Sequence, residues 1–311
     1  MGAGRQAPSR TTERRLGGLP VRPRAGHKGT FGTVCVVGGC SRGRVRYVGA
    51  PALAALGALR SGCGLCRVLT PEPVIQSVLR IASSATGVAL TVGRDGGIAG
   101  AAAVNSVIEA ADVSHALVVG PGLGAGPGVD SVVRRVWRGV GVPLVLDADG
   151  LSSLARAPEL SGAGGPAVIT PHPGEAERLM KAAGISGDPG DGGDRERIAR
   201  ALARRLSCVV VLKGSRTVVS DGERVYVNGS GGPWLATGGT GDVLAGFIGG
   251  LIAQHMAAGG DAAEIFRLAC IGVLVHGRAG DAWAREKRAT GGMLAVELTE
   301  RLVHEVERMR R

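Results

Sequence analysis

Aromatic residues are scarce in this sequence, and no apolar segment is long enough to cross a membrane. Phe, Tyr and Trp make up 3% of the 311 residues, so few side chains are available for the bases of a single-stranded nucleic acid to stack on. The chain also carries no zinc-finger or basic-zipper pattern. No run approaches the roughly 18 apolar residues of a transmembrane helix. We therefore expect neither a nucleic acid nor a membrane among its partners.

Acidic residues are outnumbered by basic ones, 26 to 37, which gives a net charge of +11. This charge fits a nucleic-acid binder or an enzyme of anionic substrates. Six arginines and a single glutamate lie in the first 24 residues. We predict a disordered basic arm over residues 1–18 and one domain over residues 19–311. The arm lacks the apolar core of a secretory signal. We expect a cytoplasmic protein, with an organelle transit peptide as the alternative.

The six cysteines do not have the spacing of a metal site. Most lie within apolar strand or helix patterns, where cysteine acts as a small core residue. Cys63 and Cys66 form one C-x-x-C pair, without a second pair or a nearby histidine. Because a zinc ion needs about four ligands, we predict no metal-ligating residues and a reducing compartment.

Short β-branched segments alternate with alanine-rich segments of helical length. This order predicts an α/β fold with a mostly parallel central sheet and helices on both faces. Asp221-Gly222 predicts one antiparallel hairpin. The expected strands are 33–37, 66–69, 116–119, 144–146, 167–169, 209–212, 217–220 and 224–227. The expected helices are 50–61, 129–138, 174–183, 194–206, 242–256, 262–285 and 294–309.

Unusual loops follow five of the predicted strands. Ligands of parallel sheets bind beyond the carboxyl ends of the strands, so five such loops at one edge predict a single site. The loops are Gly38-Gly39, Gly120-Pro121-Gly122-Leu123-Gly124, Asp147-Ala148-Asp149-Gly150, Thr170-Pro171-His172-Pro173-Gly174-Glu175 and Lys213-Gly214-Ser215.

The segment Gly238-Gly239-Thr240-Gly241-Asp242 precedes an apolar run that predicts a buried helix. A glycine-rich turn at a helix start presents backbone N–H groups and the positive end of the helix dipole, which together bind anions. A carboxylate beside such an anion cradle suits phosphoryl transfer, because it can take a proton from a hydroxyl group. Taken alone, the motif has the alternative interpretation of a glycine loop with a capping aspartate.

Taken in order, these loops closely resemble the NAD(P)H-hydrate dehydratase family, a branch of the ribokinase-like fold. The resemblance begins at His27-Lys28-Gly29-Thr30-Phe31-Gly32 and includes Tyr47-Val48-Gly49-Ala50-Pro51. It continues through the strand-end loops and ends with the glycine-rich segment that contains Asp242. About residues 19–307 are covered.

The resemblance implies a cofactor-repair reaction. The family removes water from the S epimer of NADH hydrate or NADPH hydrate at the expense of a nucleoside phosphate, with Mg²⁺. Phosphorylation turns the hydroxyl into a leaving group, and elimination restores the dihydronicotinamide. Bacterial members usually use ADP and leave AMP, whereas eukaryotic members prefer ATP. Relatives are often homotetramers. Many also carry an epimerase domain ahead of this one, so we expect an epimerase partner of this chain to be a separate polypeptide.

The family's functional residues carry over onto matching positions. Asp242 is the implied catalytic base, and Lys213 pairs with a phosphate. Asp147 and Asp149 are candidates for orienting water or Mg²⁺, and Glu175 has the alternative interpretation of a helix-start acid. The implied hydrate contacts are Ala50, Gly122, His172 and Asp242. The implied nucleotide contacts are Lys213, Gly214, Ser215, Arg216, Thr217, Gly239, Thr240 and Gly241.

Two other functions stay open at this point. A ribokinase-like vitamin-precursor kinase, acting on a hydroxymethylpyrimidine or a hydroxyethylthiazole, would share the glycine-rich loop, although segments 27–29 and 170–175 argue against it. A basic nucleic-acid-binding or scaffolding protein fits the charge but not the low aromatic content. Trp234 and Cys40 depart from the family pattern, which has a smaller residue and a serine there. We expect Trp234 to line the pocket or to cover the nucleotide.

Overall fold

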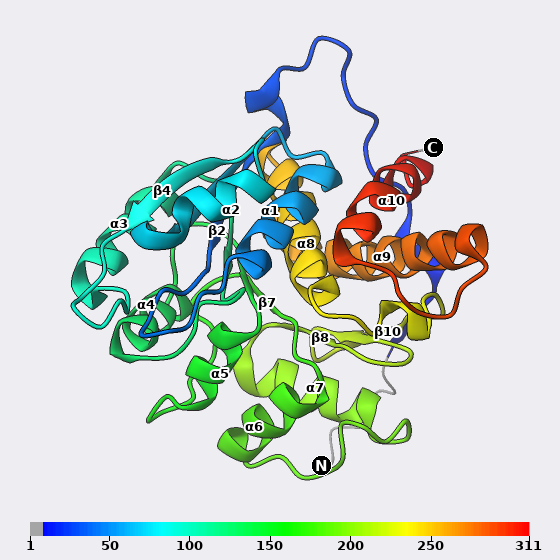
Figure 1. Ribbon diagram of the computed structural model, residues 1–311. Coiled ribbons are helices and arrows are strands. Elements are labelled where there is room, and N and C mark those ends of the chain that lie inside the picture. Colours follow the sequence, from blue (N-terminus) through cyan, green and yellow to red (C-terminus); the bar gives the residue numbers. More distant parts are fainter. Residues whose placement is uncertain (1–8, 311) are drawn as a thin grey trace.

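A twisted sheet runs through the centre of the computed structural model, which describes residues 9–310 (Figure 1). Its 10 strands follow the order β1-β10-β9-β8-β7-β6-β5-β2-β3-β4. Neighbours from β8 to β4 are parallel. The strands are β1 (Ser9–Thr11), β2 (Thr33–Val37), β3 (Leu65–Pro71), β4 (Thr86–Leu90), β5 (Ala116–Val119), β6 (Leu144–Leu146), β7 (Ala167–Ile169), β8 (Val209–Leu212), β9 (Val218–Ser220) and β10 (Arg224–Val227).

Helices cover both faces of this sheet. They are α1 (Gly49–Ser61), α2 (Ile75–Ile81), α3 (Gly100–Asp112), α4 (Pro127–Trp137), α5 (Asp149–Ala155), α6 (Pro173–Ala183), α7 (Arg195–Leu206), α8 (Thr240–Ala257), α9 (Ile265–Lys287) and α10 (Ala295–Arg308). Because strand side chains alternate, Val34 and Val36 pack in one core with α1, α8 and α9. Cys35 and Val37 pack in the other core, with α3 to α7. The predicted α/β fold is confirmed.

Two antiparallel pairings interrupt the parallel pattern. β9 runs antiparallel to β8 and to β10, so the hairpin predicted at Asp221-Gly222 is confirmed. All six cysteines are buried thiols, as their apolar surroundings predict. No helix within residues 9–310 is long and apolar enough to cross a bilayer.

Helices α1 and α8 pack unusually closely, and this contact fixes the start of α8. A side-chain carbon on Gly246 would lie 1.8 Å from the carbonyl oxygen of Ala54. One on Gly57 would lie 2.2 Å from the carbonyl oxygen of Val243. Only glycine permits this approach of two backbones. The helix that carries Asp242 is therefore locked against the helix that carries Ala50.

The structure of the N-terminal segment differs from the predicted disordered arm. Residues 1–8 lie outside the described residues, but β1 pairs in parallel with β10. Leu16, in the short helix η1 (Glu13–Leu16), is 1% exposed and belongs to the core. The guanidinium group of Arg267 donates to the carbonyl oxygen of Leu16 at 3.0 Å. A strand edge and one buried leucine thus hold residues 9–18 on the domain, despite their basic composition.

Four elements besides β1 were not predicted. Strand β4 lies at the sheet edge, and three of its five residues are exposed, so it lacks the apolar run of the central strands. Helix α2 has seven residues and α5 also has seven, which is too short for a clear helical period. Helix α3 begins at Gly100 without a side-chain cap.

The carboxyl ends of β2, β5, β6, β7 and β8 lie at one edge, as predicted.

Candidate active site

Lys213, at the end of β8, lies among carboxylates from neighbouring strand ends. Its Nζ is 2.7 Å from Oδ1 of Asp147, which is 1% exposed at the end of β6. The hydroxyl of Thr170, after β7, donates to the same oxygen at 2.6 Å. Oε2 of Glu175 is 3.9 Å from Nζ. Burial lowers the pKa of Lys213, but the charges of Asp147 and Glu175 outweigh it and raise the pKa above its ordinary value. The lysine therefore stays charged at neutral pH.

Asp242 occupies the first turn of α8. The N-cap, Gly239, has a φ of 95°, a conformation that favours glycine. The first intrahelical bond runs from the N–H of Val243 to the oxygen of Gly239, so the N–H groups of residues 240–242 point out of the helix end. A side-chain carbon on Gly241 would lie 3.2 Å from Nζ of Lys213. The helix start thus faces the lysine and forms an anion-binding corner.

The carboxyl group of Asp242 titrates near neutral pH. Burial is the main cause that raises its pKa to about 7. The negative charge of Asp147 raises it further, and Lys213 opposes the shift. A general base works best when its pKa lies close to the working pH. The environment of Asp242 therefore suits it to accept a proton at neutral pH.

A cavity of about 460 Å³ opens beside this corner. Seven of the eight predicted nucleotide contacts line it: Lys213, Gly214, Ser215, Arg216, Thr217, Thr240 and Gly241. The eighth, Gly239, does not line the cavity but caps α8 against Leu53. A phosphate group in this cavity would meet the lysine, the helix start and the turn after β8 together.

Three polar side chains that line this cavity were not predicted. Asn228, Ser230 and His276 line it. Nε2 of His276 lies 2.9 Å from the carbonyl oxygen of Thr240, so this nitrogen carries the proton. Burial lowers the pKa of His276 to about 4, and the ring is neutral at pH 7. Because His276 lies inside the apolar helix α9, no local pattern distinguishes it from a core residue.

The predicted hydrate contacts Ala50 and Gly122 adjoin one another. Gly122 has a φ of 60°, and a side-chain carbon there would lie 3.1 Å from Cβ of Ala50 and 3.0 Å from Cβ of Tyr47. The start of α1 and the loop after β5 therefore form one continuous surface. A larger residue at position 122 would crowd Tyr47 and Ala50.

His172 and Glu175 cap the start of α6. Nδ1 of His172 accepts a hydrogen bond from the N–H of Gly174 at 3.1 Å. Oε2 of Glu175 accepts one from the N–H of His172 at 2.8 Å, which is a capping box. The helix-start interpretation of Glu175 is confirmed, and the same carboxylate also faces Lys213. Burial is the main cause that raises the pKa of Glu175, whereas Lys213 opposes it. The His172 side chain stays half exposed and open to a ligand.

The loop after β6 supplies two carboxylates with different roles. Asp147 is the buried counter-ion of Lys213, as described above. Oδ2 of Asp149 accepts a hydrogen bond from the N–H of Gly124 at 2.8 Å, and burial raises its pKa. Ala148 between them has a φ of 49°, which costs a non-glycine residue energy. Within residues 9–310, no three His, Cys, Asp or Glu side chains gather as metal ligands.

Trp234 does not line the nucleotide cavity, so the first of its two expected roles is wrong, and covering the nucleotide stays a prediction. Its ring packs over Gly232 and Gly280 and borders a separate shallow cleft with Asp281 and Arg285. Its neighbours in the short helix η4 (Pro233–Leu235), by contrast, do line the cavity.

A family model described as NAD(P)H-hydrate dehydratase matches residues 34–304, which include every strand-end loop of the site. The chain belongs to the NAD(P)H-hydrate dehydratase family. The predicted family and its ribokinase-like α/β fold are thereby confirmed.

Individual members of the family are similar over most of this chain. The bifunctional NAD(P)H-hydrate repair enzyme Nnr of Moorella thermoacetica is 39% identical over 91% of this chain and 50% of its own length. The ADP-dependent (S)-NAD(P)H-hydrate dehydratase of Neisseria meningitidis is 34% identical over 89% of this chain and 86% of its own. The chain thus spans about half the length of the bifunctional relative.

A solved structure extends the similarity to three dimensions. The ADP/ATP-dependent NAD(P)H-hydrate dehydratase of Bacillus subtilis, co-crystallized with ATP/Mg²⁺, is 29% identical. It superposes with a TM-score of 0.75 over 98% of this chain and 99% of its own. Almost the whole of this chain therefore shares its fold with that solved structure.

Proposed function

We propose that this protein dehydrates the S epimer of NADH hydrate and NADPH hydrate, with ADP or ATP as the phosphoryl donor. One observation carries the proposal. A carboxyl group with a pKa of about 7 lies at a helix start that faces a charged lysine, and Thr240 and Gly241 of that helix start line a cavity of about 460 Å³. Family membership supplies the substrate class, since relatives are named for this reaction.

In this proposal the nucleotide occupies the cavity beside Lys213, and the hydrate approaches from the side of Ala50 and Gly122. Asp242 takes the proton of the hydrate hydroxyl, whose oxygen attacks the terminal phosphorus of ADP and releases AMP. Lys213 and the N–H groups at the start of α8 hold the negative charge that builds on the phosphoryl oxygens. Loss of phosphate and of one ring proton then restores the dihydronicotinamide. The products are NADH or NADPH, AMP and orthophosphate.

Mg²⁺ is part of the proposal as a companion of the nucleotide. Mg²⁺ usually binds through one or two carboxylates together with phosphate oxygens and water. The strand-end carboxylates Asp147 and Asp149 fit such a partial ligand set. The ion would supply further positive charge against the phosphates. Removal of Mg²⁺ by a chelator should therefore weaken nucleotide use and leave the fold intact.

The deciding experiment is incubation of the purified protein with chemically prepared hydrate and either ADP or ATP. Return of the dihydronicotinamide absorbance together with orthophosphate supports the proposal and identifies the donor. An Asp242→Asn variant is the matched control. A stable phosphorylated alcohol, formed from a hydroxymethylpyrimidine or a hydroxyethylthiazole without hydrate turnover, would instead identify a vitamin-precursor kinase.

Assembly and location complete the proposal. We infer a cytoplasmic homotetramer, as the family resemblance implies. We also infer that it works with an epimerase, because a relative is named as a bifunctional repair enzyme. Light scattering of the purified protein measures the assembly, and an epimerase added in trans should allow the R epimer to be consumed as well.

A further inference from the structure

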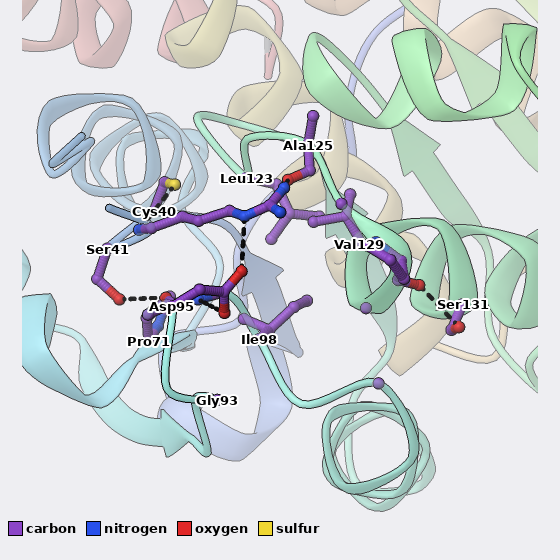
Figure 2. A pocket seen from close by; sticks show the side chains of 17 residues that line it. Cys40, Ser41, Pro71, Gly93, Asp95, Ile98, Leu123, Ala125, Val129 and Ser131 are labelled. Carbon is purple, nitrogen blue, oxygen red and sulfur yellow. Dashed lines mark hydrogen bonds and ion pairs between the residues drawn. The ribbon is translucent and has the colours of Figure 1, made fainter. Parts of the chain in front are cut away.

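A second cavity, of about 300 Å³, lies at the same edge of the sheet as the candidate active site (Figure 2). Three loops enclose it: the one after β2, the one between β4 and α3, and the one between β5 and α4. Leu123 and Ile98, both buried, give it an apolar floor. None of its lining residues lines the nucleotide cavity. No residue predicted for nucleotide or hydrate binding is among them.

The walls of this cavity are tied together by side chains. Nε of Arg42 is 2.8 Å from Oδ2 of Asp95, and its Nη1 donates to the carbonyl oxygen of Ala125 at 2.8 Å. The hydroxyl of Ser41 donates to the carbonyl oxygen of Gly96 at 2.8 Å. Hydrogen bonds and an ion pair thus hold the loops around the cavity in place.

One short loop separates this cavity from the hydrate side of the active site. Gly122 contacts Ala50, and Leu123 forms part of the cavity floor, one residue further along. The N–H of Gly124 donates to Asp149, and a side-chain carbon on Gly124 would lie 2.8 Å from Sγ of Cys40, which lines the cavity. A ligand that passes over the 122–124 loop would therefore reach from one space into the other.

Exposed arginines lie on two of the loops that line the cavity. Arg42, Arg44 and Arg46 lie on the loop after β2, and Arg94 lies on the facing loop beside Asp95; all four are exposed. Arg44 and Arg94 form no hydrogen bond or ion pair with side chains of residues 9–310. The starts of α3 and α4 also border the cavity, and neither has a side-chain cap. Anionic groups are favoured in such surroundings.

We propose that this cavity binds the adenosine-phosphate half of the dinucleotide hydrate. The inference rests on the proposed function, which places the reacting ring at Asp242 and fills the 460 Å³ cavity with the phosphoryl donor. The rest of the substrate is a chain of phosphates and an adenosine that must extend beyond the ring. The apolar floor at Leu123 and Ile98 suits the base, and Arg44 and Arg94 suit the phosphates.

Filling the cavity tests this assignment. Ser131 lies on α4 and lines the cavity, whereas Arg134 on the same helix is exposed and does not. Ser131→Trp should raise KM for NADPH hydrate about tenfold or more and leave KM for ADP unchanged. Arg134→Trp should change neither constant. An unchanged hydrate KM in a folded Ser131→Trp protein, or a rise confined to ADP, would overturn the proposal.

Charge removal provides a second test that does not alter the core. Arg44→Gln and Arg94→Gln should each raise KM for NADPH hydrate about two- to fivefold, the strength of an exposed ion pair. A loss larger for NADPH hydrate than for NADH hydrate assigns the arginines to the 2′-phosphate, and an equal loss assigns them to the pyrophosphate. No change in either variant contradicts the proposed phosphate contacts.

The two proposals can fail separately. If the unaltered protein restores neither hydrate with either nucleotide, the proposed dehydratase function is wrong. Calorimetric titration with ADP-ribose then still measures binding to this cavity, and Ser131→Trp should abolish any binding that occurs there. If the dehydratase is active but ADP-ribose neither binds nor competes with the hydrate, only the assignment of this cavity is wrong.

Discussion

Asp242→Asn separates the chemical role of this residue from its structural cost. The substitution keeps the side-chain shape and removes the proton acceptor. Turnover should fall about a hundredfold or more, the usual contribution of a positioned general base. Nucleotide binding should survive, because backbone N–H groups and Lys213 form the anion-binding corner. In the parent, kcat/KM should rise about tenfold per pH unit up to about pH 7 and then level off.

The same substitution should stabilise the fold at high pH. The pKa of Asp242 is about 7 in the folded protein, against an ordinary value of 3.8. Between these values the folded state binds more protons than the unfolded state, so the free energy of unfolding falls as the pH rises. The full difference, reached above pH 7, is about 4 kcal/mol. Asparagine does not ionise, so the variant should be more stable than the parent by up to this amount at pH 8.

Urea denaturation at pH 4 and pH 8 measures this effect. The gain of Asp242→Asn should be small at pH 4 and large at pH 8. Asp194→Asn serves as the matched control, since a hydrogen bond from Arg197 holds the pKa of Asp194 below its ordinary value, and its loss should destabilise the fold at pH 8. If Asp242→Asn gains nothing between the two pH values, or turns over at a near-normal rate, our description of this carboxyl group is wrong.

Three further predictions concern binding and packing. His172→Ala should raise KM for the hydrate a few-fold to about tenfold and leave nucleotide affinity unchanged, whereas Lys213→Met should weaken nucleotide affinity first. Separate titrations with each ligand distinguish the two effects. The reverse pattern would show that we have placed the two ligands the wrong way round. Leu16→Ala should lower the free energy of unfolding by about 2–5 kcal/mol, and an unchanged urea midpoint would show that the N-terminal segment does not pack on the domain. Gly246→Ala should push α1 away from α8 and lower the free energy of unfolding by at least about 1–3 kcal/mol, which a thermal melt measures. In the control Gly165→Ala the new side-chain carbon meets no atom within 4 Å, so its melting temperature should not change.

The sequence alone determined the features that depend on neighbours along the chain. Near-continuous apolar segments such as residues 33–37 can only be central strands of a covered sheet, because both of their faces are apolar. Glycine-rich turns after those strands indicate the edge at which ligands bind. The start of α8 and the anion-binding role of its glycines follow from helix geometry.

Tertiary structure alone decided which groups meet and what charge they carry. Lys213 and Asp147 are 66 residues apart, and only the order of β6, β7 and β8 brings them to 2.7 Å. The pKa of Asp242 depends on burial and on carboxylates from other strand ends, which no local pattern contains. The same reason applies to the basic N-terminal segment. Its composition predicts disorder, but the open edge of β10 and the core around Leu16 offer backbone hydrogen bonds and apolar burial that the segment cannot form by itself.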